Sequence, residues 1–373
     1  MNEVLQRLGW TAEWTAAWQP YAAGGLRPAR VAAQHRGGYV LLTADDHDPP
    51  ELLEPRADLS GKLRRAAAAD PAAGPAVGDW VAIRGGVPAG CATIHDVLPR
   101  RSQLSRKAAG RVTVEQVVAA NVDTVMVVIP LDRPIAERRL ERLLTIARGS
   151  GADAVIVLTK ADLCTDPAAV AATLGPLCTR AGAEIPVHTI SSITGDGLAA
   201  LDRYIDAPRT SALFGASGVG KSTLLNRWLG HERQAVAALT SEGKGRHTTT
   251  HRELLVLPQG GLVIDTPGMR ELGLWSSDDG LSDIFADISA LAEQCRFRDC
   301  SHHEEPGCAV QAAVTSGAVD RERAASFLKL LREQAHVARE KDDLARARAR
   351  QADKVAGRAL GRLYRDRDRD RDR

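Results

Sequence analysis

The spacing of apolar positions changes along the chain and divides it into three parts. Up to about residue 105 the apolar runs are short and separated by Gly-Gly, Pro-Pro and Gly-Asp, a pattern typical of a small Greek-key barrel. From residue 116 onward, apolar strand-like runs alternate with helical patterns, which predicts a mostly parallel α/β sheet. After about residue 276 the helical pattern returns, and a short cysteine-rich stretch interrupts it.

These parts predict a multidomain protein. We expect an N-terminal extension and an OB-like β-barrel over residues 1–108, an α/β domain over 109–275, and a helical domain over 276–373. The expected barrel strands are the runs Arg30–Ala33, Tyr39–Thr43, Asp79–Ile83 and Cys91–Leu98. The expected elements of the α/β domain are a buried strand run within Val117–Leu131, a helix over Ile135–Arg148, and strands at Ala154–Thr159, Ile185–Ile190, Ser211–Phe214 and Gly261–Ile264.

The pattern near the N-terminus indicates a packed helix, whereas that of the last nine residues does not. Trp10, Trp14 and Trp18 recur every four residues, so we expect them on one face of a short helix that docks on the following domain. Residues 365–373 alternate Arg and Asp without an apolar face, which indicates a disordered tail.

Residues 215–222 read Gly-Ala-Ser-Gly-Val-Gly-Lys-Ser and fit the phosphate-binding pattern G-x4-G-K-[ST]. A strand-like run precedes the motif and a helix-like run follows it, so backbone N–H groups and a helix N-terminus are expected to face phosphate oxygens. Lys221 is expected to bridge the β- and γ-phosphates, and the Ser222 hydroxyl to bind Mg²⁺. The expected nucleotide contacts are Gly215, Ala216, Ser217, Gly218, Val219, Gly220, Lys221, Ser222 and Thr223. The alternative is a chance match in a surface loop.

Two further segments match the parts of a nucleotide switch. Asp265-Thr266-Pro267-Gly268 follows an apolar strand, so Asp265 is expected to hold Mg²⁺ through water and the Gly268 N–H to contact the γ-phosphate. A threonine of Thr248–Thr250, in a Gly/Lys-rich loop, is expected to complete the Mg²⁺ shell. Thr250 is our first choice, although spacing does not decide among the three.

A third motif indicates that the base is guanine. Thr159-Lys160-Ala161-Asp162 ends an apolar strand and matches [N/T]-K-x-D. The Asp162 carboxylate can accept from N1–H and the exocyclic amine of guanine, donors that adenine lacks in those places. Ser191 and Ser192 open the loop after the next strand and are expected to support the base edge. The alternative for Asp162 is the N-cap of an ordinary helix.

The order of these motifs is unusual, since the base motif precedes the phosphate loop. Closing one sheet with this order requires a circular permutation, which is tolerable because the termini of a compact domain often lie close together. We therefore expect a circularly permuted P-loop GTPase domain.

Cys295-x4-Cys300-x-His302-x5-Cys308 supplies three thiolates and one imidazole, a full tetrahedral set for zinc. Four protein ligands leave no open position, so the zinc is expected to be structural. His303 is an alternative fourth ligand, and three buried cysteines without metal are the alternative to the site itself.

This arrangement resembles the circularly permuted RsgA family, the ribosome-small-subunit-dependent GTPases. The likeness covers the barrel, the Arg-Arg-Ser-x-Leu-Ser-Arg exit at 100–106, the permuted motifs, the segment Arg246–Thr250 and the zinc ligands, where it favours His302. It implies a GTPase that is slow alone, faster on the small ribosomal subunit, and active in that subunit's late maturation.

The resemblance also bears on catalysis. Met269 stands where many GTPases carry glutamine, so the family pattern implies that His247 positions the attacking water, with Lys221 as the second catalytic group. An alternative is that His247 only packs or binds RNA. One departure is Thr159, which replaces a commoner asparagine and is expected to cost a hydrogen bond to the phosphate loop.

The distribution of charge is compatible with a polyanionic partner and does not by itself select one. The net charge of +2 combines +7 over residues 321–373 with −5 over the rest. This tail fits RNA or merely a solvated helix. With the exposed barrel face, the expected RNA contacts are Arg100, Arg101, Arg106 and Lys107; a barrel used for protein docking is the alternative.

The remaining expectations concern the protein's location, oligomeric state and partners. No apolar run is long enough for a bilayer and no secretory signal opens the chain, so we expect a cytoplasmic, monomeric protein whose partners are the small ribosomal subunit and its rRNA. Two competing functions remain: an RNA-binding regulator that holds nucleotide without turnover, and a P-loop kinase or ATPase, which Asp162 argues against. We also hypothesise that GTP or GDP repositions the zinc domain against rRNA.

Overall fold

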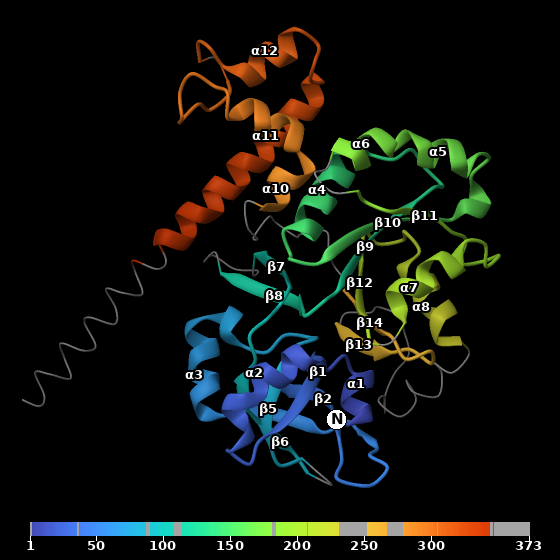
Figure 1. The fold of residues 1–373 in the computed structure, drawn as a ribbon, viewed down its shortest axis with the longest axis vertical. Coiled ribbons are helices and arrows are strands. Elements are labelled where there is room, and N and C mark those ends of the chain that lie inside the picture. The colour runs from blue at the N-terminus through green and yellow to red at the C-terminus, as the bar shows by residue number, and fades with distance from the viewer. Residues whose placement is uncertain are drawn as a thin grey trace, which may run out of the picture.

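The computed structural model describes residues 2–35, 37–86, 90–107, 114–180, 184–206, 208–230, 252–266, 279–303, 305–343 and 346. Figure 1 shows three parts in a row, with a small barrel at one end, an α/β sheet in the middle and the C-terminal helices at the other end. The expected order of barrel, α/β domain and helical domain is therefore the observed one.

Five strands close the N-terminal barrel. They are β1 (Arg27–His35), β2 (Gly38–Ala44), β4 (Arg56–Leu59), β5 (Trp80–Arg84) and β6 (Ala92–Val97). Strand β1 pairs with β2 and β5, and β6 pairs with β5 and β4, while β4 returns to β2, so the ring has no open edge. The barrel and its four expected strands are confirmed; β4 and the short β3 (Leu52–Leu53) were not anticipated.

The barrel interior is lined by small and branched side chains from every strand, including Val31, Leu41, Ala57, Ile83 and Ile94. Helix α3 (Gly61–Ala69), which begins at the Ser60 N-cap, and the turn η1 (Pro71–Ala73) connect β4 to β5.

The tryptophans dock on the barrel as expected. Helices α1 (Glu3–Arg7) and α2 (Ala12–Ala22) precede β1. The rings of Trp10 and Trp14 lie 4.7 and 6.4 Å from that of Trp80, a fully buried residue of β5. Trp10 lies just before α2 instead of within it, because the helix begins after Thr11.

The central sheet has the strand order β11-β10-β9-β12-β14-β13. The parallel strands are β9 (Thr124–Pro130), β10 (Asp153–Thr159), β11 (Val187–Thr189), β12 (Thr210–Phe214) and β14 (Leu262–Asp265). Strand β13 (Glu253–Val256) runs antiparallel between β14 and barrel strand β1. Alternate residues of β9 enter different cores, with Val125 and Val127 on one face and Met126 and Val128 on the other. The parallel sheet is thus confirmed, and it is buried on both faces.

The run Val117–Leu131 contains two strands. Its first half belongs to β8 (Glu115–Ala120), which pairs with β7 (Gln103–Lys107) in a separate hairpin. Asn121 has a φ of 55°, and this left-handed residue turns the chain between β8 and β9.

Helices cover the sheet. They are α4 (Glu137–Arg148), α5 (Pro167–Thr173), α6 (Gly175–Arg180), α7 (Asp202–Ile205) and α8 (Lys221–Leu229), with short turns η2 (Ala161–Leu163) and η3 (Leu198–Leu201). Helix α4 lies within the expected range, and its Leu140 and Leu144 pack in the same core as Val125.

The C-terminal part is helical, as expected. It comprises α10 (Asp279–Ile284), α11 (Ala286–Ala292), α12 (Ala309–Thr315) and a long helix over residues 321–343. Helix α10 lies against α4, where a Cβ at Gly280 would come 2.3 Å from the Thr145 carbonyl oxygen. Within the described ranges, no helix combines the length and apolar character needed to cross a membrane.

Candidate GTP site and cysteine cluster

The phosphate-loop residues connect a buried strand to a helix, as the motif requires. Strand β12 ends at Phe214 and α8 begins at Lys221. Gly218 and Gly220 have φ values of 78° and 105°, which other residues rarely adopt. At Gly215 a Cβ would come 2.5 Å from the Val128 carbonyl oxygen, so only glycine permits this close approach to β9.

Lys221 is held against the loop. Its Nζ donates to the carbonyl oxygens of Gly215 and Ala216, each at 2.8 Å. Burial lowers the pKa of Lys221, and the charge of Asp265 opposes this shift. Asp265 is 5% exposed at the end of β14, the strand beside β12, so both expected phosphate-side residues lie at one edge of the sheet.

The base motif and the phosphate loop are joined directly. The buried Thr159 hydroxyl donates to the Val219 carbonyl oxygen at 2.5 Å. The threonine therefore retains a hydrogen bond to the loop, where we had expected its substitution for asparagine to cost one. The chain thus positions the two motifs against each other although 60 residues separate Thr159 from Val219.

Ser191 contacts Asp162, the residue expected to read the base. Its hydroxyl donates to Asp162 Oδ1 at 2.5 Å, and the N–H groups of Ile193 and Thr194 donate to the same Ser191 oxygen. Ser192 Oγ is buried without a hydrogen-bond partner among the described residues. Asp162 belongs to η2, and its side chain accepts from Ser191, so the simple N-cap alternative does not describe it.

Asp132 is a residue of this site that the sequence analysis missed. It accepts from Lys160 Nζ at 2.6 Å, and this contact, followed by one from Arg133, lowers the pKa of Asp132. Lys160 itself has a φ of 60°. The available signal was positional, because Asp132 follows β9 as Lys160 follows β10, and carboxyl ends of neighbouring parallel strands meet at one edge.

Three expected site residues lie outside the described part of the chain. They are His247, Thr250 and Gly268. Their roles remain predictions.

The expected zinc ligands come together. One donor atom from each of Cys295, Cys300, His302 and Cys308 lies within 4.8 Å of the others. Cys295 Sγ lies 3.9 Å from Cys308 Sγ, and His302 Nδ1 lies 3.4 and 3.7 Å from these sulfurs. A tetrahedral site with Zn–S of about 2.3 Å and Zn–N of about 2.0 Å has edges of roughly 3.8 and 3.5 Å. The residues therefore fit zinc.

The histidine that lies with the three cysteines is His302 and not His303. His302 is 6% exposed with a φ of 58°, and burial lowers its pKa, which favours the neutral imidazole that metals bind. His303 Nε2 instead contacts Arg332 Nη2 at 3.0 Å on the exposed side.

Arg100 was expected to contact RNA, but its side chain is bound within the protein. Its guanidinium bonds to Asp79, to the carbonyl oxygens of Ala72 and Gly74, and to Gln103, and its side chain is only 13% exposed. This side chain fastens the barrel internally, so we leave it out of the proposed RNA surface.

Arg101 is more exposed than Arg100, and Arg106 and Lys107 lie in β7. Arg101 lies over the Trp14 ring at 5.0 Å and is 32% exposed. Arg106 Nε donates to the Gln116 side chain across the β7–β8 hairpin. The backbone of Lys107 ends β7.

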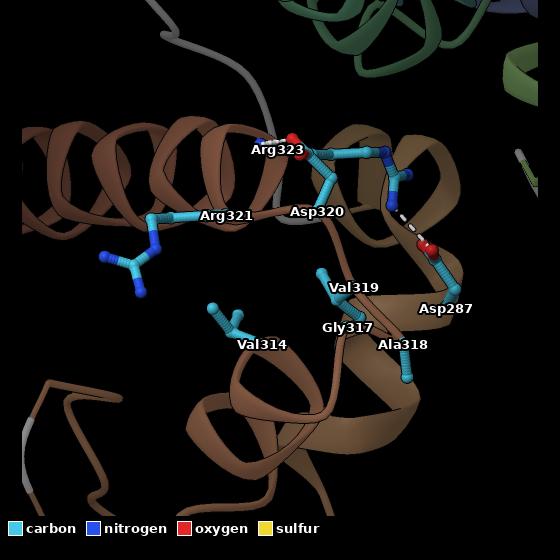
Figure 2. A pocket seen from close by; sticks show the side chains of 8 residues that line it. All are labelled: Asp287, Val314, Gly317, Ala318, Val319, Asp320, Arg321 and Arg323. Atoms are coloured by element: carbon cyan, nitrogen blue, oxygen red, sulfur yellow. Dashed lines mark hydrogen bonds and ion pairs between the residues drawn. The ribbon is translucent and has the colours of Figure 1, made fainter.

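A cavity of about 420 Å³ lies in the C-terminal part, away from the nucleotide motifs. Figure 2 shows its lining, in which Arg323 reaches Asp287. The lining residues are Asp287, Val314, Gly317, Ala318, Val319, Asp320, Arg321 and Arg323, none of which belongs to a predicted site.

Known proteins share this organisation. A protein-family model described as RsgA GTPase matches residues 97–275. A small ribosomal subunit biogenesis GTPase RsgA from Opitutus terrae is 48% identical over 355 residues, 92% of this chain and 94% of that protein. Its namesake from Streptomyces coelicolor is 41% identical over 363 residues, 97% of this chain and 94% of that protein.

Solved structures agree with the fold. YjeQ from Thermotoga maritima aligns with a TM-score of 0.56 at 27% identity, covering 83% of this chain and 98% of that one. YloQ, described as a circularly permuted GTPase, aligns with a TM-score of 0.54 at 24% identity over 85% of this chain and 96% of its own. With its base motif ahead of its phosphate loop and relatives along nearly its whole length, the chain belongs to the RsgA GTPase family of GTP-hydrolysing enzymes.

Proposed function

We propose that this GTPase acts in the biogenesis of the small ribosomal subunit, the role that the names of its relatives give to those proteins. The observation that carries its guanine-nucleotide chemistry is the hydrogen bond from Thr159 to Val219. Because this bond joins the base motif to the phosphate loop, one ligand with a guanine at one end and phosphates at the other can engage both.

Asp162 reads the base in this proposal. The Ser191 hydroxyl orients its carboxylate toward N1–H and the exocyclic amine of guanine. Leu163 and Ile193 are 64% and 70% exposed beside these two polar residues, and they supply apolar surface that a base would cover.

The phosphates lie against residues 215–222 at the N-terminus of α8. Lys221 contacts the β- and γ-phosphates and stabilises charge on the transferred group. Ser222, Asp265 and Thr250 would hold Mg²⁺, which supplies positive charge to the phosphate oxygens when bound. Gly268 contacts the γ-phosphate, and His247 orients the attacking water.

The cysteine cluster holds one structural Zn²⁺. Its ligand spacing supports this role, and a closed Cys3His set leaves no position for a substrate. Arg101, Arg106, Lys107 and the basic tail contact rRNA. The protein works as a monomer in the cytoplasm, where ribosomal subunits mature.

The test is GTP hydrolysis by the wild-type protein and by Lys221→Ala, each with and without purified small ribosomal subunits. We expect subunits to stimulate the wild type and the substitution to lower turnover roughly 100- to 1,000-fold, the usual effect of losing one oxyanion donor. Lys62→Ala, an exposed lysine of α3, is the matched control. Equal turnover with and without subunits would contradict the ribosomal role, and no turnover at all would leave an RNA-binding regulator.

A further inference from the structure

The loop between Cys295 and Cys300 exposes an aromatic ring. The chain has four phenylalanines, of which Phe214, Phe285 and Phe327 are at most 3% exposed, whereas Phe297 is 43% exposed. Among the large hydrophobic side chains exposed in the described ranges, Phe297 is the only aromatic one. The ring is therefore open to contact from solvent, and its surroundings decide what it can bind.

The loop is held in place on both sides of the ring. Its two ends are cysteines of the zinc cluster. The Arg296 N–H donates to the Gly307 carbonyl oxygen at 3.2 Å, and the Cys300 N–H donates to that of Phe297 at 3.3 Å. Gly307 has a φ of 79°, and a Cβ there would come 3.1 Å from Arg296 Cβ. The ring is therefore presented by a preorganised loop, which lowers the entropy lost on binding.

One guanidinium group lies over the ring, and further arginines are near it in sequence or beside the zinc cluster. Arg296 lies over Phe297 with its Cζ 5.4 Å from the ring centroid, and Arg298 follows in the same loop. Arg332 of the long helix contacts His303, the residue after the ligand His302 of the proposed zinc site.

The Glu305 carboxylate faces neutral donors beside the cysteines and keeps its negative charge. Glu305 accepts from the Ser301 N–H, the Ser301 hydroxyl and the His303 N–H, which lowers its pKa to about 2. These donors and Glu305 lie between Cys300 and Cys308. Asp299 is the one acidic residue between Cys295 and Cys300.

We propose that Phe297, with Arg296, stacks an unpaired base of RNA, while Arg298 and Arg332 contact the adjoining phosphates. An aromatic ring next to arginines is the arrangement by which proteins bind unstacked bases, since every base offers a π-face. The inference deepens the proposed function and rests on it, because it names the element of the zinc domain that would contact RNA.

The experiment measures binding of the full chain to purified small ribosomal subunits and to a single-stranded 12-nucleotide RNA containing 2-aminopurine. Phe297→Ala is expected to weaken both interactions about 5- to 150-fold, the usual effect of losing one stacked base. Phe297→Trp should bind as the wild type does, and Phe297→Leu should bind as weakly as the alanine variant. The wild-type protein should change the 2-aminopurine fluorescence and Phe297→Ala should not.

Salt dependence separates stacking from charge. Arg298→Gln should lower the slope of log affinity against log salt by about one phosphate contact, whereas Phe297→Ala should leave the slope unchanged. Zinc content and basal GTP hydrolysis verify that each variant is folded.

Two results would overturn the inference. Wild-type affinity of Phe297→Leu would mean an apolar contact with protein, and wild-type affinity of Phe297→Ala on both probes would mean that the ring binds nothing there. If these results accompany GTP hydrolysis that subunits still stimulate, the proposed function stands and only this inference fails. If subunits neither bind nor stimulate the wild type, both fail.

Discussion

A single hydroxyl, that of Thr159, connects the base motif to the phosphate loop. Thr159 is 1% exposed, and its hydroxyl donates to the Val219 carbonyl oxygen. A Cβ added at Gly220 would come 3.4 Å from the Thr159 hydroxyl oxygen. Loss of a buried partner leaves the Val219 carbonyl oxygen without this donor, which costs more than the bond itself contributes.

Thr159→Val preserves the shape of the side chain and removes the hydroxyl. We expect GTP affinity to fall about tenfold, in line with roughly 1–2 kcal/mol for a lost buried hydrogen bond. Competition against a fluorescent GTP analogue measures the effect. Thr159→Ser, which retains the hydroxyl, should bind nearly as the wild type does, and a large loss in the serine variant would show that packing decides the affinity.

Asp132 positions Lys160 from the neighbouring strand. Asp132→Asn should raise KM for GTP at most about fivefold with unchanged kcat, since exposed ion pairs contribute little. Because salt screens such a pair, the difference from wild type should shrink at 1 M salt. Arg133→Gln is the matched control, since Arg133 contacts the same carboxylate without touching the base motif.

At the scale of elements, α4 fastens the C-terminal part to the sheet. Arg323 Nε donates to Glu141 Oε1 at 2.9 Å, and its Nη1 donates to Asp287 at 2.5 Å. Arg142 pairs with Glu333 at 2.6 Å. The Arg323 and Glu141 side chains are 10% and 4% exposed, so separating these elements would leave buried charges without partners.

Arg323→Gln should therefore lower the free energy of unfolding by about 3–5 kcal/mol. Urea unfolding, monitored by a signal from α4 and the C-terminal helices, measures this loss. Glu322→Gln, which removes an exposed pair with Arg138, should cost less than about 1 kcal/mol. Similar losses of stability in both variants would contradict a stabilising role for the buried Arg323–Glu141 pair.

The stability lost in Arg323→Gln should depend on pH. Burial raises the pKa of Glu141, and Arg323 opposes that rise. A carboxyl group whose pKa is higher in the folded state binds more protons there, so stability falls as pH rises above the ordinary carboxyl range. Without Arg323 the pKa rises further, and the deficit relative to wild type should be larger at pH 8 than at pH 5. A deficit that grows toward pH 5 would exclude this explanation.

Much of this architecture was predictable from local pattern. Short apolar runs and turn residues predicted β2 at Tyr39–Thr43 within one residue at each end, and the glycines of the phosphate loop predicted its strand–loop–helix setting. Partners far apart along the chain were not predictable. No periodicity links Glu141 to Arg323, which are 182 residues apart, or shows that Arg100 turns inward to Asp79.

At the scale of the whole molecule, the cysteine cluster and the nucleotide site are separate structures. The ligands lie in the C-terminal part, whereas Asp162 and Lys221 belong to the central sheet. Whether GTP and GDP reposition the zinc domain stays a prediction, and the ion pairs with α4 favour movement of that domain together with α4. Equal rRNA affinity of the GTP-analogue and GDP forms would contradict any repositioning.

Removal of zinc should disrupt the cysteine cluster and leave the nucleotide site intact. Chelation, or Cys295→Ser, should unfold the region around α11 and α12 and weaken binding to small ribosomal subunits, while basal GTP hydrolysis remains within about twofold, because metal binding is coupled to folding of its own ligands. Cys91→Ser, at an exposed cysteine of the barrel end, is the control. Circular dichroism, zinc content and turnover report the three effects, and parallel loss of turnover would show that the domains fold as one unit.

The strand order has a mechanical consequence. Within the central sheet the chain begins at β9 and ends at β14, and β12, which leads into the phosphate loop, lies between them. The barrel precedes β9 and the C-terminal helices follow β14, at opposite ends of the molecule (Figure 1). Tension between two ends gripped by one large particle would therefore be shared among β9, β12 and β14, the pairing of β1 with β13 and the contact of α10 with α4, so the strand that leads into the phosphate loop carries only part of it.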